Sequence, residues 1–147
     1  MSQEIDYQIE PSLTVSEYIA VLQSSTLAER RPIDDVPRMD RMLRQADIIL
    51  TARCQGDLIG IARTLTDGSY STYLADLAVA QSFQGRGIGR ELIRRTHEAA
   101  GLHTNLILIA APGARTYYPH IGMAAHDSCW IIRGESPLHP RLHHEFG

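Results

Sequence analysis

The sequence contains no lysine and only two cysteines, and both absences exclude kinds of protein. A P-loop nucleotide site needs a lysine after its glycines, so this chain has none. Cys54 and Cys129 are too few for the disulfide framework of a small secreted protein and have no C-x-x-C spacing. We therefore expect both to be buried thiols in a reducing cytosol.

Long apolar runs and excess positive charge are also missing. No run approaches the roughly 20 apolar residues that span a bilayer, and residues 1–12 lack the basic and apolar regions of an export signal. The 14 basic residues, all arginine, are outnumbered by 17 acidic ones, whereas general nucleic-acid binding needs a basic surface. These features predict a cytoplasmic protein with no membrane and no nucleic-acid partner.

The length and composition fit one ordinary globular domain. With 147 residues, 44% of them hydrophobic, the chain can enclose a core without disulfides or metals. We expect one domain over residues 1–135, followed by a polar, proline-containing extension over residues 136–147. Seven histidines are present, but none forms a metal-ligand signature, so we expect no metal.

Apolar periodicity and turn residues predict the order of elements. That order is strand, two helices, three strands, helix, strand, short helix and final strands, which is a mixed α/β (α+β) sheet rather than a repeating βαβ array. The continuous apolar run 105–110 is typical of a strand covered on both faces. The expected helices cover residues 14–25, about 39–43, 87–100 and 114–118, and the expected strands cover 7–10, 47–54, 58–66, 70–79, 105–110 and a final hairpin within 123–133.

The stretch FQGRGIGREL, residues 83–92, places alternating glycines where a helix begins. A dinucleotide fingerprint, G-x-G-x-x-G, fails because Arg90 stands at the last glycine position. The glycines then predict a turn that permits positive φ and lets free N–H groups at the helix start face an anion. The alternative is a purely structural turn with solvated arginines.

Four arginines and one acid, Glu91, follow within this stretch and the next turn. Cations near a helix start are unfavourable by a few tenths to about 1 kcal/mol each, unless a counter-charge is present. A bound phosphate would reverse that sign. The arginines are Arg86, Arg90, Arg94 and Arg95, and the same helix has an apolar face of Ile88, Leu92, Ile93, Ala99 and Ala100.

Two motifs here resemble those of one family. Gln84, Gly87 and Gly89 match the signature Gln/Arg-x-x-Gly-x-Gly/Ala of the GCN5-related N-acetyltransferases (GNAT superfamily), and residues 114–123 are similar to that family's later Ala-x-x-Phe-Tyr-x-x-x-Gly-Phe motif. The resemblance implies a sheet of about seven strands with four helices, splayed between its fourth and fifth strands. It also implies that acetyl-coenzyme A, the co-substrate, lies in the gap.

The resemblance further implies residue roles. Backbone groups of Leu77, Ala78 and Val79 would meet the pantetheine and thioester, and Tyr118 would be the catalytic acid that assists the leaving thiolate. The pyrophosphate would be wrapped by Gln84, Gly85, Arg86, Gly87, Ile88, Gly89 and Arg90, with help from Arg115. The family's frequent asparagine is replaced by Ala111, and the glutamate of some relatives by Ala75.

The acceptor is a primary amine of a small molecule or a protein in this interpretation. Asp34 and Asp35 could attract an ammonium group, whereas Arg30, Arg31 and Arg38 could hold a carboxylate. A further acceptor-side candidate is Asp76, which strand alternation turns away from the face of Ala75 unless the strand bulges there.

The alternative for Asp76 is that it is paired with other side chains of the protein. The alternative for the charged residues of the loop is that they are solvated and neutralise one another. Alternatives in function are a non-catalytic acyl-coenzyme A sensor, an oxygen acceptor or a longer acyl chain. A homodimer is compatible with the sequence, although no sequence feature establishes it.

Overall fold

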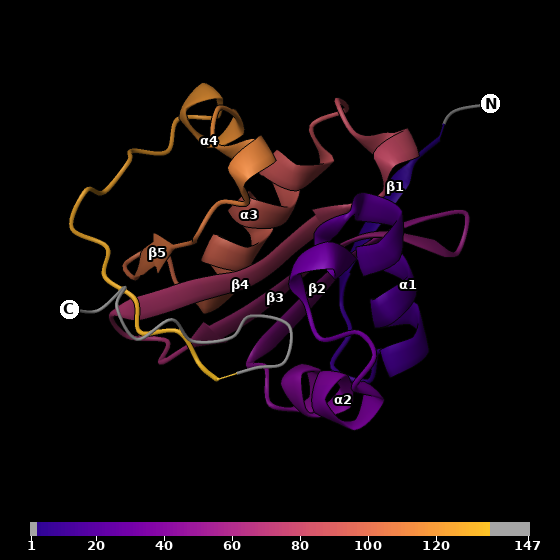
Figure 1. The fold of residues 1–147 in the computed structure, drawn as a ribbon. Coiled ribbons are helices and arrows are strands. Elements are labelled where there is room, and N and C mark those ends of the chain that lie inside the picture. The colour runs from indigo at the N-terminus through magenta and orange to yellow at the C-terminus, as the bar shows by residue number, and fades with distance from the viewer. Residues whose placement is uncertain (1–2, 136–147) are drawn as a thin grey trace. The chain divides into compact units, whose positions relative to one another are not determined.

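A five-stranded sheet runs through the first part of the chain in the order β1-β2-β3-β4-β5 (Figure 1). The structure, a computed structural model, describes residues 3–135 and divides after Ile109 into two compact units. The strands are β1 Ile5–Ile9, β2 Ile48–Cys54, β3 Asp57–Thr66, β4 Ser71–Val79 and β5 Asn105–Ile107. The first four are antiparallel and β5 is parallel to β4, which confirms the mixed α/β prediction.

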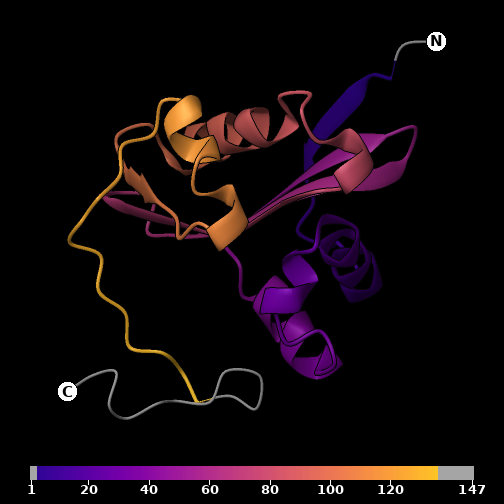
Figure 2. The same cartoon turned by 45° about the horizontal axis from the view of Figure 1, so that its top comes forward.

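Helices cover both faces of this sheet (Figure 2). α1 (Val15–Ser25) and α2 (Val36–Arg44) lie on one face, and α3 (Ile88–Ala100) lies on the other. Short 3-10 turns, η1 (Leu27–Arg30) and η2 (Gln81–Phe83), follow α1 and β4. Two separate cores result, because successive strand side chains point to opposite faces.

Each core has a well-buried centre. Leu50 of β2 and Leu92 of α3 pack in the core beneath α3, while neighbouring Ile49 packs with Tyr18 and Leu22 of α1 in the other. Leu92 and Leu22 are fully buried. The predicted apolar face of α3 is wrong at one residue, since Ala99 is exposed and Thr96 occupies the buried position instead.

The sheet opens between its fourth and fifth strands. β4 pairs with β5 only over Ser71–Tyr73, so residues 74–79 have no β5 partner within the described residues. The other edge of β4 stays paired with β3 up to Val79. This opening is the predicted splay.

β4 contains a bulge that reverses its side-chain alternation. Asp76 pairs with Arg63 of β3 and Leu74 pairs with Thr64, so Ala75 is an extra residue on β4. Leu74 packs in the core beneath α3, yet Asp76, two residues later, bonds to Tyr18 of α1 on the opposite face.

The C-terminal strand predictions differ from the structure. β5 has only three residues rather than six, and it is not covered on both faces, because Ile107 is 58% exposed. The hairpin predicted within 123–133 is absent among the described residues, so the sheet there has five strands rather than about seven. Apolar residues alone do not make a strand, which also needs a neighbouring backbone to pair with.

The second unit is described by itself. It contains η3 (Pro112–Ala114) and α4 (Tyr117–His120) in place of the single helix predicted over 114–118. The prediction that both cysteines are buried holds for Cys54 and is wrong for Cys129, which is exposed in a segment without helix or strand. The predicted extension, residues 136–147, lies outside the described residues.

No helix within residues 3–135 combines the length and apolarity needed to cross a membrane. The longest of the described helices, α3, has 13 residues and carries several charges.

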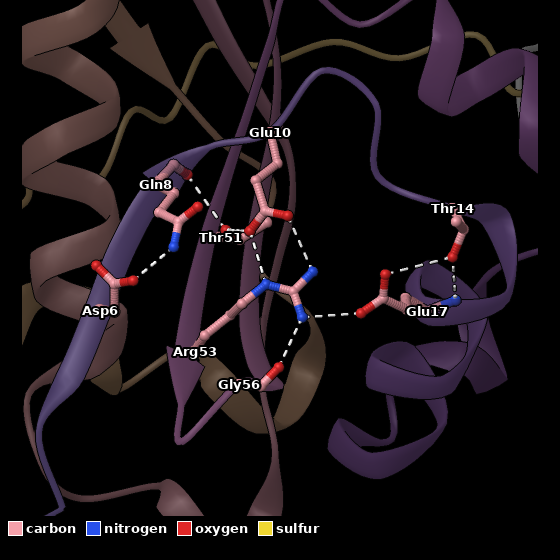
Figure 3. Close-up of polar contacts among 8 residues, drawn as sticks. All are labelled: Asp6, Gln8, Glu10, Thr14, Glu17, Thr51, Arg53 and Gly56. Carbon is pink, nitrogen blue, oxygen red and sulfur yellow. Dashed lines mark hydrogen bonds and ion pairs between the residues drawn. The ribbon is translucent and has the colours of Figure 1, made fainter.

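An arginine-centred network ties α1 to the first two strands (Figure 3). Arg53 of β2 binds both oxygens of Glu10, which follows β1, at 2.8 and 2.9 Å, and reaches Glu17 of α1 at 2.8 Å. Its guanidinium also donates to the Gly56 carbonyl in the β2–β3 turn. The Arg53 side chain is 16% exposed, so these pairs are shielded from much of the solvent.

We expect Arg53→Met to lower the free energy of unfolding by about 1–3 kcal/mol, between the values for exposed and buried pairs. Hydrogen bonding from Arg53 is the main cause of the lowered pKa of Glu10, so the Glu10 contribution exists above that group's ordinary pKa of 4.5 and is lost as pH falls through the lowered value. Urea unfolding at pH 7 and pH 3 measures this. The exposed Arg94→Gln is the control, and equal midpoints for wild type and Arg53→Met at pH 7 would contradict the prediction.

Candidate functional site

The glycine-rich turn before α3 has the backbone that the sequence predicts. Gly85 and Gly87 have φ of 81° and 79°, in the left-handed region that favours glycine. Gly87 is the N-cap of α3, and no side chain caps this helix start. The chain therefore begins α3 with its N-terminal amides open rather than covered by a serine, threonine or acid.

Six consecutive amides, those of residues 85–90, are available at this turn. Within the described residues, none of them donates to a backbone or side-chain acceptor, and the first such bond runs from the Glu91 amide to the Gly87 carbonyl at 3.1 Å. Helix N-termini concentrate positive partial charge on free amides. This set of donors is suited to an anion.

The arginines of α3 divide into paired and unpaired groups. Arg94 and Arg95 both bind Glu91, at 2.5 and 2.9 Å, and Arg94 also binds Glu98 at 2.7 Å. Hydrogen bonds from Arg94 and Arg95 lower the pKa of Glu91 to about 2. The intramolecular partners explain these two arginines without a ligand.

Arg86 and Arg90 have no acidic partner within residues 3–135. Arg86 stacks 4.9 Å from the ring centroid of Phe83 and donates to the Gln3 side chain and, at 3.5 Å, to the Ser82 carbonyl, which are neutral groups. Arg90 is exposed in the first turn of α3 and makes no hydrogen bond or ion pair with the described part of the chain. The charge left uncompensated at the helix start is therefore that of two arginines, not four.

The open stretch of β4 leads directly into this turn. Leu77 and Val79 pack toward the α3 side of the sheet and Ala78 toward α1, while β4 remains paired with β3. The Gln84 side chain donates to the Val79 carbonyl at 2.9 Å, which ties the turn to the end of β4. The predicted residues 77–79 and 84–90 are thus brought together.

Tyr118 and Arg115 belong to the second unit. Tyr118 stands in α4 with its ring packed edge-on against Tyr117, with centroids 5.2 Å apart. Burial, and then the neighbouring Tyr117, raise the pKa of the Tyr118 phenol above its ordinary value. Pro119 follows at once, and α4 ends at His120.

The two loop aspartates are exposed. Asp35 is the N-cap of α2, where its carboxylate accepts a hydrogen bond from the Arg38 amide at 3.1 Å, and Asp34 precedes it. Capping accounts for Asp35 as a local structural residue.

Asp76 is fully enclosed by donors. Its side chain accepts hydrogen bonds from Arg31 Nε and Arg63 Nε, both at 2.6 Å, and from the Tyr18 hydroxyl. Burial alone would raise the pKa of Asp76, but the charges and hydrogen bonds of the two arginines and Tyr18 outweigh it and lower the pKa. Asp76 is therefore an ionised, paired carboxylate, as in the alternative considered from the sequence.

The sequence analysis did not predict Arg63 and Tyr18 as partners of Asp76. The available signal was Asp76 itself, because an acid between apolar strand residues needs buried partners. Arg31 is one of the three arginines that could hold a carboxylate by the sequence analysis, and the carboxylate that it binds in the structure is that of Asp76.

Within residues 3–135, no three histidine, cysteine or acidic side chains gather in a way that could hold a metal ion.

Comparison with known proteins assigns this chain to a family. Several solved structures that superpose on this chain over about nine tenths of its length are acetyltransferases or putative acetyltransferases. Residues 32–133 match the acetyltransferase (GNAT) domain, so the chain belongs to this family. The suspected superfamily is confirmed.

Individual relatives are distant. A putative acetyltransferase from Deinococcus radiodurans R1 superposes with a TM-score of 0.69 at 22% identity, over 90% of this chain and 94% of that one. The aminoglycoside N-acetyltransferase AAC(6')-Iy, solved in complex with CoA, superposes with a TM-score of 0.69 at 16% identity, over 92% of this chain and 98% of that one.

One curated relative was also found. It is the uncharacterized N-acetyltransferase ycf52 of Gracilaria tenuistipitata var. liui, which is 27% identical over 63% of this chain. The chain spans about half the length of that relative, because the match covers 53% of it.

We expect Asp76→Asn to lower the free energy of unfolding by about 3–5 kcal/mol, since the buried guanidinium of Arg63 and the partly buried one of Arg31 would lose their counter-charge. Because the native pKa of Asp76 is lowered, its contribution is present above the ordinary carboxyl pKa of 3.8 and declines as pH falls through the native value. Urea unfolding across pH 2–7 tests this, with half-exposed Asp40→Asn as the control. A variant as stable as wild type at pH 7 would contradict it.

Proposed function

We propose that this protein is an N-acetyltransferase that moves the acetyl group of acetyl-coenzyme A to a primary amine of a small molecule or protein. The observation that carries the proposal lies at the start of α3, where six amides and two arginines have no acceptor or acidic partner among the described residues. Family membership supports it, as does the CoA complex of one structural relative.

The donor set of the turn fits a pyrophosphate. Two glycines with positive φ allow phosphate oxygens to approach the backbone, and the helix dipole adds favourable charge. The planar guanidinium forks of Arg86 and Arg90 suit phosphate oxygens, and Arg115 is the candidate from the second unit. Residues 84–90 would bind the diphosphate, and Leu77, Ala78 and Val79 the pantetheine.

The thioester supplies an activated acetyl group. In this proposal the residues of the chain polarise it: a backbone amide near Val79 donates to the carbonyl oxygen, where negative charge develops as the amine attacks. The open edge of β4 supports this assignment, because its backbone groups have no β5 partner within the described residues.

Tyr118 is proposed to donate a hydrogen bond to the departing sulfur. The ordinary pKa of a thiol is about 8.5 and that of a phenol is about 10. Burial raises the pKa of Tyr118 further. Complete proton transfer to the thiolate is thus uphill, while a neutral phenol remains a good donor at pH 7.

A carboxylate base is not assigned. Asp76 is buried in ion pairs that lower its pKa, so it is a weak proton acceptor. Ala75 has no ionisable group. We propose that the acceptor amine loses its proton to water, which predicts a rate that rises with pH toward the pKa of the amine.

Removing the unpaired guanidinium of Arg90 tests the coenzyme site. We expect Arg90→Gln to weaken coenzyme A binding about tenfold, because one charge-assisted contact to phosphate is lost. Isothermal calorimetry at low salt measures this. Arg94→Gln is the matched control, since Arg94 already binds Glu91 and Glu98. Failure of the wild type to bind coenzyme A would sink the transferase proposal.

Tyr118→Phe separates binding from chemistry. We expect coenzyme A affinity to be unchanged and kcat to fall about 10²-fold or more, as for loss of a general acid. Thiol release with an amine panel gives kcat, and calorimetry gives the affinity. Tyr117→Phe is the neighbouring control. Unchanged turnover over the whole pH range would remove Tyr118 from the mechanism, and coenzyme binding without any turnover in the wild type would favour a sensor.

A further inference from the structure

The buried cluster around Asp76 has one positive charge too many. Arg31 and Arg63 both pair with Asp76, and no other acid among the described residues lies within ion-pair distance of either guanidinium. Tyr18 is neutral, because burial and then the charge of Asp76 raise its pKa well above the usual range. The cluster therefore carries a net charge of +1.

That excess charge sits in a shielded place. Asp76 is 1% exposed, and the side chains of Arg63 and Arg31 are 10% and 23% exposed. An unbalanced charge with so little contact with water is unfavourable until an anion joins it. Arg31 is the more accessible of the pair, so an anion can approach from its side.

The donors left over in the cluster suit a planar anion. Each arginine donates from Nε to Asp76. The two terminal nitrogens of Arg31 also donate one hydrogen bond each, to the carbonyls of Arg30 and Ala75. Beyond Asp76 and Tyr18, no residue in the described part of the chain engages the Arg63 side chain.

The terminal nitrogens of Arg63 are not completely enclosed. The buried side-chain atoms without any partner among the described residues are the hydroxyls of Thr64 and Thr96. A terminal nitrogen of Arg63 that lacks a partner is therefore in contact with solvent.

The cluster lies beside the open part of β4. Asp76 directly precedes the stretch Leu77–Val79, and the bulge at Ala75 is what turns the Asp76 side chain toward α1 and Arg31. Three residues of strand cover about 10 Å, so a group held here stays within a small molecule's length of Val79.

We propose that Arg31 and Arg63 bind a carboxylate of the acceptor, so that the preferred acceptor is an amine that carries a carboxylate, as an amino acid does. This inference rests on the proposed transferase function. A single carboxylate balances the +1 charge and fits the guanidinium fork. A phosphate monoester, with a charge of about −1.5 to −2, would over-compensate it.

Matched acceptors test the proposal on the wild-type protein. Thiol release is measured for phenylalanine, its amide and phenethylamine, and for glutamate, γ-aminobutyrate and butylamine, each at equal concentration of neutral amine. We expect kcat/KM to be at least about tenfold higher when a carboxylate is present, mainly through KM. Peptides with glutamate or glutamine beside the N-terminal residue distinguish a protein acceptor from a free amino acid.

Variants link that preference to the cluster. Arg63→Gln, and Arg31→Gln as a second variant, should each lose the preference, which is measured within one variant as the ratio of kcat/KM with and without the acceptor carboxylate. Arg38→Gln is the matched control, because Arg38 is exposed on α2 and makes no ion pair among the described residues. Equal kcat/KM for the matched wild-type acceptors, or a preference kept in both cluster variants, overturns the proposal.

A binding readout separates this proposal from the transferase function. The melting temperature of the coenzyme-free protein is measured with phenylalanine and with its amide at equal ionic strength. We expect the amino acid alone to raise it, in wild type and Arg38→Gln but not in Arg31→Gln. That shift without coenzyme A binding would overturn the transferase and leave the carboxylate site standing. Coenzyme A binding with no shift in melting temperature and no acceptor preference would overturn the carboxylate site and leave the transferase proposal standing.

Discussion

The short pairing between β4 and β5 is the constraint on which the site depends. Parallel pairing stops after Tyr73, so the next six residues of β4 keep β3 on one edge and no β5 on the other within the described residues. A sheet paired to its end would use those backbone groups for its own ladder. The opening instead leaves an edge of β4 that is held by β3 and continues into the glycine turn, as the proposed binding of an extended coenzyme requires.

Two electrostatic features flank this stretch of β4, and both have a deficit of negative charge. At its end, free amides and two arginines are gathered at the start of α3. At its beginning, the bulge at Ala75 delivers Asp76 to the opposite face, where two arginines share one carboxylate. A chain with a net charge of −3 thus concentrates local positive charge at both ends of the open stretch of β4. Local excess of this kind, rather than the overall charge, is what selects an anionic ligand.

Most of the first unit was predictable from local pattern. Helical spacing gave α1 and α3 nearly to the residue, since Thr14 and Gly87 are good N-terminal boundaries and Gly101 is a good C-terminal one. The prediction weakened at the C-terminal end. Residues 105–110 and 123–133 have apolar content typical of strands, yet most of them have no backbone partner in the described structure, and a sequence does not state its partners.

The sequence by itself determined the chemistry of the turn at residues 84–90, because positive φ, missing side-chain caps and the local excess of arginine are set by neighbours along the chain. Only the tertiary structure decided which charges stay free. Glu91 and Glu98 neutralise Arg94 and Arg95, whereas Asp76 meets Tyr18 and Arg31 across 58 and 45 residues of chain. The cause is the extra residue at Ala75, which reverses the alternation of β4 and so chooses the face on which a buried acid finds its partners.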